Sequence, residues 1–157
     1  MVRQHIHLKN PHNRIILNAA GVLSKGGLII YPTDTVYGLV RHCSPGPYTF
    51  ILPSTREIPK NMLSKRKEIG IRIPDSEVCH ALIENLGHPI ATTSVNIDPA
   101  EILNSPDEIE NRYQNQVDLM LDADWLPDAH ESTVVSLIDD DLQILRKGKG
   151  NIQKLYE

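Results

Sequence analysis

Gly26 to Leu39 reads GGLIIYPTDTVYGL, and this stretch combines a strand signal with a polar turn. The glycine pair ends the preceding segment, and the short apolar run at 28–31 predicts a buried strand. Pro32 removes a backbone donor and fixes φ where that strand ends. In open α/β sheets, ligands collect at the carboxyl ends of strands. The polar side chains that follow therefore fit either a ligand site or a turn through which the strand leaves; they are Thr33, Asp34 and Thr35.

Length and composition predict one soluble domain. The chain has 157 residues and a formal net charge of −4, so no global positive field indicates nucleic-acid binding. Aromatic residues make up 4% of the chain, which argues against bases stacking along an aromatic platform. Cys43 and Cys79 lack metal-type spacing and are predicted to be free thiols, buried or partly buried, in a reducing compartment. Without an apolar run of signal-peptide or membrane-span length, we expect a cytoplasmic protein with no membrane partner.

Hydrophobic periodicity predicts alternating strands and helices. A short strand at 4–9 would place His5 and His7 on one face; a metal pair would fit, but no third ligand is nearby, so solvated histidines are favoured and no metal site is predicted. A helix is expected from Asn10–Pro11 to a cap at Gly26. Further strands are predicted at 48–53, 69–74, 88–96, 117–121, 131–137 and 142–146, and further helices after Ser76, after Ser105 and from Asn151 to Tyr156. We expect one α/β domain over 1–157 with mixed strand directions.

The connection from Val40 to Pro47 is too short to join the strands predicted at 28–31 and 48–53 if they are parallel. Parallel strands need a crossover of about a dozen residues or more, and this segment is short and rich in proline. Either the strands at 28–31 and 48–53 form an antiparallel hairpin, or a segment is absent from the sequence within this connection.

Several polar and basic positions elsewhere are candidates for ligand contact. Thr92, Ser94 and Asn96 fall at period two and would project from one face of a strand end. Arg72 lies between aliphatic residues, so it would either face water from an alternating strand or reach a carboxylate or phosphate in a cleft. The remaining basic candidates favour phosphate or RNA contact, with a solvated surface as the alternative; they are Lys60, Lys65, Arg66, Lys67, Lys147 and Lys149.

Four stretches resemble, in order, the signatures of the YrdC/YciO family. They are YPTDTVYGL at 31–39, SPGPYTFILP at 44–53, IRIP at 71–74 with TSVN at 93–96, and ESTVV at 131–135. The amino-terminal helix and KRKEIG at 65–70 look more like the YciO branch than the YrdC branch. The resemblance covers nearly the whole chain.

This resemblance implies a single-domain, twisted, open mixed α/β sheet with flanking helices (YrdC/RibB-like) around a large concave, positively charged cleft. In the family, this cleft is associated with binding of nucleotide or double-stranded RNA. In the YrdC branch the activity is L-threonylcarbamoyladenylate synthesis from threonine, bicarbonate and ATP, a nucleotidyltransfer that begins the making of threonylcarbamoyladenosine in tRNA. ATP, with Mg, would then be a substrate rather than a tightly bound cofactor, and accessory tRNA-modification proteins would be partners.

The resemblance also implies roles for individual residues. Thr35, with Thr33, and Arg72 would hold threonine, and Arg72 would pair with its carboxylate. Thr92 and Ser132 would line the same pocket. The nucleotide would be contacted by Ser94, Asn96 and Arg146, with Arg146 at the phosphates. No residue is assigned as catalytic.

The chain also departs from the family pattern. The usual lysine-arginine segment (K-x-R-P) has no counterpart, and its place falls at the Val40/Arg41 junction, inside the connection that is too short, so we predict that a segment is absent from the sequence there. Ile97-Asp98-Pro99 replaces the usual serine-glycine after the S-x-N motif. These departures keep open two alternatives to the synthase. One is a non-catalytic module of the YciO type that binds tRNA, ribosomal RNA or the ribosome, and the other is a nucleotide binder of unrelated purpose.

Overall fold

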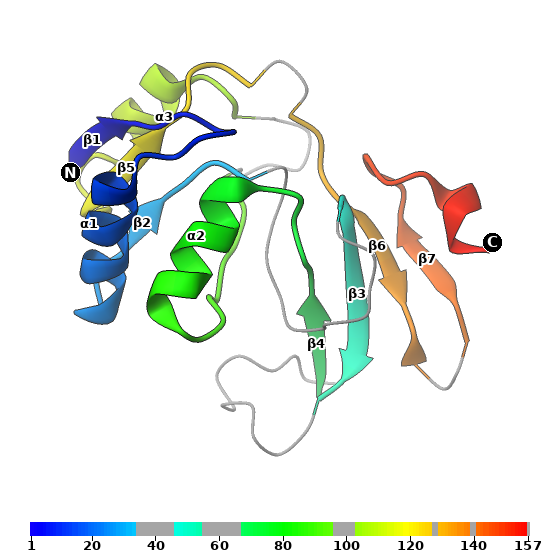
Figure 1. Ribbon diagram of the computed structural model, residues 1–157. Helices are drawn as coiled ribbons and strands as arrows, with labels where there is room; N and C mark the ends of the chain where they lie inside the picture. Colours follow the sequence, from blue (N-terminus) through cyan, green and yellow to red (C-terminus); the bar gives the residue numbers. More distant parts are fainter. Residues whose placement is uncertain (34–45, 55–66, 96–102, 127–128, 139–140, 157) are drawn as a thin grey trace. The chain divides into compact units, whose positions relative to one another are not determined.

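The computed structural model describes residues 1–33, 46–54, 67–95, 103–126, 129–138 and 141–156 (Figure 1). The chain divides into two compact units. The first contains Met1–Asp34 and Ser76–Ala129, and the second contains Thr35–Asp75 and His130–Glu157. Within the described residues, no helix is long and apolar enough to cross a membrane.

The first unit is built on a parallel sheet with the order β1-β5-β2. Its strands are β1 (Val2–His5), β5 (Leu119–Asp122) and β2 (Ile29–Ile30). Val2 and Ile29 both pair with Leu119, so β5 is the central strand, and all four of its residues are buried. A strand paired on both edges and covered on both faces is expected to be largely apolar, which explains Leu119, Met120 and Leu121; the fourth residue, Asp122, is a buried carboxylate paired with Arg3.

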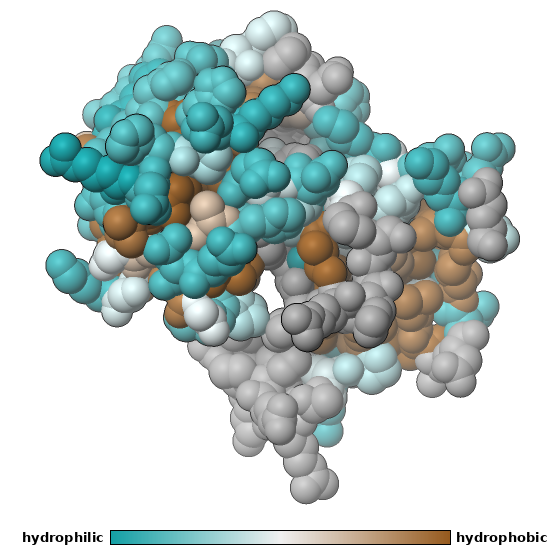
Figure 2. Space-filling model, in the orientation of Figure 1, coloured by the Kyte–Doolittle hydropathy of each residue, from teal (hydrophilic) through white to brown (hydrophobic). Residues whose placement is uncertain are grey.

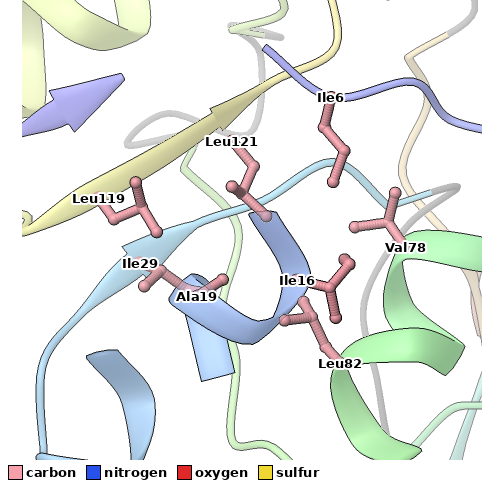
Figure 3. Packing of buried hydrophobic residues seen from close by; sticks show 8 residues of the cluster. All are labelled: Ile6, Ile16, Ala19, Ile29, Val78, Leu82, Leu119 and Leu121. Carbon is pink, nitrogen blue, oxygen red and sulfur yellow. The ribbon is translucent and has the colours of Figure 1, made fainter. Parts of the chain in front are cut away.

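Helices cover both faces of this sheet. The helices α1 (Asn13–Ser24) and α2 (Glu77–Leu86) pack on the face of Leu119 and Leu121 (Figure 3). The third helix, α3 (Pro106–Tyr113), packs with Met120 on the other face, because successive strand residues point to opposite sides. The core cluster shown in Figure 3 consists of Ile6, Ile16, Ala19, Ile29, Val78, Leu82, Leu119 and Leu121. Each fully buried Ile or Leu in it contributes about 1.5–3 kcal/mol, so this layer stabilises the unit.

An ion cluster ties α3 to the sheet. The Arg3 guanidinium on β1 contacts Asp107 and Glu110 of α3 at 2.8 and 2.7 Å and Asp122 of β5 at 2.7 Å. Hydrogen bonds to these carboxylates, that of Asp107 first, raise the pKa of Arg3. The cluster joins three elements that are far apart in sequence.

The second unit is a mixed sheet with the order β4-β3-β6-β7. Its strands are β4 (Glu68–Ile71), β3 (Tyr48–Pro53), β6 (Thr133–Ser136) and β7 (Gln143–Arg146). The inner strands β3 and β6 are parallel, and each outer strand is antiparallel to its neighbour.

One face of this sheet is apolar. Tyr48, Phe50 and Val135 are buried there, and Leu155 of the short 3-10 helix η3 (Ile152–Leu155) packs against them. Figure 2 shows hydrophobic surface where this sheet lies in Figure 1. Leu145 of β7 is an exposed hydrophobic side chain.

The α/β class with mixed strand directions and flanking helices is confirmed, and most helices and strands lie close to their predicted ranges. Ser76 caps α2 through the Cys79 amide, and Gly87 ends it with a left-handed φ of 72°. At α1 the cap is His12, two residues after the predicted start at Asn10–Pro11. The burial predicted for Cys79 is also confirmed, and its Sγ lies 3.9 Å from the Pro32 carbonyl oxygen.

Two structural predictions are wrong. No strand is present in the described part of 88–96, which ends at residue 95. Pro89 lacks a backbone donor there, and only Ile90 and Ala91 precede the hydroxyl cluster, so little apolar surface holds this segment in a sheet. The antiparallel hairpin of β2 with β3 is also wrong, since β2 pairs with β5 while β3 pairs with β4 and β6. The other alternative, a segment absent at Val40/Arg41, lies outside the described residues and stays a prediction, as does the large cleft.

Candidate functional site

Predicted ligand residues gather at one end of the sheet in the second unit. Arg72 directly follows β4, Ser132 directly precedes β6, and Arg146 is the last residue of β7. Because β4 and β7 run opposite to β3 and β6, the ends of the outer strands and the starts of the inner strands lie at the same end of the sheet. Strand pairing therefore brings together residues that are 60 and 14 positions apart in the sequence.

Arg72 is buried, with 1% of its surface exposed. Its Nε donates a hydrogen bond to the Gly46 carbonyl at 3.1 Å, and the Gly46 amide donates to the Ile73 carbonyl at 2.9 Å. The alternative in which Arg72 faces water is therefore wrong. Burial of a guanidinium is costly unless charge and hydrogen bonding compensate for it, and its planar fork matches carboxylate and phosphate oxygens. A buried arginine at a strand end is thus typical of an anion-recognition site.

Ser132 links two neighbouring strands through its hydroxyl. Its Oγ lies 2.8 Å from Thr49 Oγ1 of β3 and accepts from Arg146 Nη2 of β7 at 3.2 Å, while its carbonyl accepts from Arg146 Nε at 3.1 Å. Ser132 is 5% exposed, so this hydroxyl is held in place by its partners. Thr49 was not predicted as a site residue. The sequence did carry one signal for it, since successive side chains of a strand point to opposite faces. Because Tyr48 and Phe50 point into the core, Thr49 must face the other side.

Arg146 also forms an ion pair that the sequence did not reveal. Its Nη1 lies 2.8 Å from Glu131 Oε2, and the two side chains are 41% and 30% exposed. The guanidinium is therefore held by Glu131 and Ser132, the two residues directly before β6.

The loop after β7 lies directly on this segment. The Thr133 hydroxyl accepts from the Gly148 amide at 3.1 Å and donates to the Gly150 carbonyl at 2.8 Å. The Lys149 amide donates to the Glu131 carbonyl at 2.8 Å. A Cβ on Gly148 would lie 2.3 Å from the same carbonyl oxygen, so only glycine permits this approach. The loop thus fixes the backbone beneath the Ser132 and Glu131 side chains.

The basic residues of the second unit are described only in part. Lys67, Lys147 and Lys149 are exposed, and Lys67 has a positive φ of 57°. Lys60, Lys65 and Arg66 lie outside the described residues, as do Thr35, Asn96 and Cys43.

The first unit carries the other predicted hydroxyls. Thr33 follows the carboxyl end of β2 and is half-buried, Thr92 is half-buried and Ser94 is exposed. All three strands of this sheet are parallel, and ligands of α/β proteins commonly bind at the carboxyl ends of such strands. The position of Thr33 is therefore consistent with a ligand contact rather than only a turn.

The carboxyl ends of β1 and β5 are joined by a histidine–carboxylate pair. His5 Nε2 lies 3.0 Å from Asp124 Oδ2, and this hydrogen bond raises the pKa of His5. The described residues contain no group of three or more potential metal ligands.

The sequence of this chain is similar to a known protein family and to several of its members. Residues 39–148 match the family model Sua5_yciO_yrdC, described as telomere recombination. The chain is 31% identical to the YciO protein of Escherichia coli strain K12 over 95% of this chain and 96% of that protein. That alignment runs over 199 positions, so YciO contains residues with no counterpart in this chain of 157. A threonylcarbamoyl-AMP synthase of Pyrococcus abyssi is 24% identical over 83% of this chain and 53% of its own length.

Solved structures agree with this relationship. The crystal structure of E. coli YciO superposes with a TM-score of 0.87 and 30% identity over 98% of each chain. The P. abyssi Sua5 structure complexed with L-threonine has a TM-score of 0.84 and 20% identity over 99% of this chain and 60% of that one, which shows a common fold. This chain therefore belongs to the Sua5/YciO/YrdC family.

Proposed function

We propose that this protein binds threonine and ATP and makes L-threonylcarbamoyladenylate. The observation that carries the proposal is the buried Arg72 guanidinium at the end of a sheet that also carries Ser132 and Arg146. Relatives support the choice, because the P. abyssi protein is a threonylcarbamoyl-AMP synthase and its structure contains L-threonine.

The proposed reaction brings two anionic groups together. The threonine amine attacks bicarbonate and loses water to give a carbamate, whose oxygen attacks the α-phosphorus of ATP, and pyrophosphate leaves. The substrate ATP would arrive with Mg. Arg72 would bind the threonine carboxylate, and Arg146 would stabilise charge that develops on the phosphates. The family resemblance further assigns threonine contacts to Thr33, Thr35, Thr92 and Ser132, and nucleotide contacts to Ser94 and Asn96.

The test is pyrophosphate release that requires both threonine and bicarbonate, together with calorimetric titration of threonine. Arg72→Met should weaken threonine binding by about 30-fold or more, since breaking a buried charged pair typically costs about 2–5 kcal/mol. Arg72→Lys should not restore it, because lysine lacks the planar fork.

Arg14→Met is the matched control, because Arg14 is an exposed arginine on α1. It should leave threonine binding and turnover unchanged. Wild-type protein that releases no pyrophosphate with all three substrates present would reject the proposal.

The second candidate is a non-catalytic module that binds tRNA, ribosomal RNA or the ribosome. The observation that favours it is the exposure of Lys67, Lys147 and Lys149, together with the similarity to YciO. Its RNA affinity should fall steeply as salt increases, because phosphate contacts release counterions. RNA binding that is absent or independent of salt would exclude it.

A further inference from the structure

The ion pair of Glu131 and Arg146 places a carboxylate where a phosphate would bind. A guanidinium has five N–H donors, and three of those of Arg146 are already engaged. Nε and Nη2 donate to Ser132, and Nη1 forms an ion pair with Glu131 at 2.8 Å. The positive charge that would attract a phosphate is thus already balanced by a carboxylate.

This pair is arranged so that the carboxylate can leave while the arginine stays. Glu131 is 30% exposed, so its side chain can rotate into water without opening the core. Its backbone is held separately, because its carbonyl accepts from the Lys149 amide at 2.8 Å. Arg146 keeps its two bonds to Ser132 when the carboxylate departs.

We propose that Glu131 is an internal counter-ion that an incoming phosphate group must displace from Arg146, and that it thereby sets phosphate affinity at this site. Glu131 acts through Arg146 and is a positioning residue. The inference rests on the proposed function for the assignment of phosphates to Arg146.

The experiment is calorimetric titration of the full chain with inorganic pyrophosphate. Glu131→Gln keeps the size of the side chain and removes its charge. It should tighten pyrophosphate binding by about three- to tenfold, somewhat more than an exposed ion pair is usually worth, because the negative charge near the ligand also disappears. A residue that served only stability would not raise affinity when replaced.

Two further variants identify the cause of any increase in pyrophosphate affinity. Asp141→Asn removes one negative charge from the same unit, at the opposite end of β7, and should leave affinity unchanged. In an Arg146→Met background, Glu131→Gln should have no effect, because the group through which Glu131 acts is gone. Thermal unfolding of each variant checks the fold, and Glu131→Ala serves as a second neutral variant.

The results separate this inference from the proposed function. Tighter pyrophosphate binding through Arg146 without any threonine-dependent turnover would keep the inference and reject the synthase. Turnover in the wild type combined with unchanged or weaker pyrophosphate binding in Glu131→Gln would reject the inference and keep the synthase. The inference is also overturned if Glu131→Gln still tightens pyrophosphate binding in the Arg146→Met background, or if no variant binds pyrophosphate.

Discussion

Replacing Gly148 by alanine tests the close packing beneath the candidate site. The new Cβ would lie 2.3 Å from the Glu131 carbonyl oxygen and 2.4 Å from the Ser132 carbonyl carbon, both of them backbone atoms. The loop must therefore move, which weakens the bonds from the amides of Gly148 and Lys149. Overpacking costs about 1–3 kcal/mol and each weakened hydrogen bond about 1 kcal/mol, so we expect the free energy of unfolding to fall by about 3 kcal/mol.

Urea denaturation followed by circular dichroism measures this loss, and in thermal unfolding it corresponds to a Tm lower by about 6–12 °C for a chain of this size. Gly21→Ala is the matched control, because Gly21 lies inside α1 and a Cβ added there would meet no atom within 4 Å. That substitution should stabilise the protein by up to about 1 kcal/mol. A loss below about 1 kcal/mol for Gly148→Ala would refute the argument that this loop requires glycine.

Two further predictions concern pH and chain length. The hydrogen bond to Asp124 raises the pKa of His5 above its usual 6.5, so the pair should stabilise the protein fully below about pH 6.5 and lose this contribution as pH rises through the folded-state pKa. The free energy of unfolding of the wild type should exceed that of His5→Gln most near pH 5.5, and the two should be equal near pH 9. An NMR titration midpoint for His5 at or below 6.5 would contradict this prediction. If a segment is absent between Val40 and Arg41, intact-mass spectrometry of the expressed full-length protein should give more than 17.6 kDa, whereas a mass that matches 157 residues would exclude it.

Much of the local structure could be predicted because its signals lie within a few residues. Ser76 and Gly87 bound α2 as their capping chemistry predicts, and Pro106 opens α3. Strand pairing could not be predicted in the same way, because it depends on contacts distant in sequence. The hairpin of β2 with β3 was wrong for this reason, since the partner of β2 is β5, about 90 residues further along the chain.

The candidate site shows the same division. Arg72 could be selected from the sequence because it lies between aliphatic residues of a strand, whereas Ser132 and Arg146 were selected through the family resemblance. Thr49 and Glu131 could not, because their importance follows from cross-strand register and from the direction of the Arg146 side chain. Alternation shows only that Thr49 faces away from the core, and a glutamate before a strand is common, so neither feature identifies a site residue without its partner.

The two arginines of the candidate site differ in a way that bears on which anion each would bind. Arg72 is 1% exposed, so an anion that reaches it must itself lose its water, and because this cost rises steeply with charge it is smaller for a singly charged carboxylate than for a phosphate chain. Arg146 is 41% exposed and already shares its charge with Glu131, so a ligand there can remain partly hydrated but must compete with a carboxylate. A phosphate chain, with more than one negative charge, is better able to compete than a single carboxylate. Burial and pairing therefore favour a carboxylate at Arg72 and a phosphate chain at Arg146, which is the arrangement that the proposed function requires.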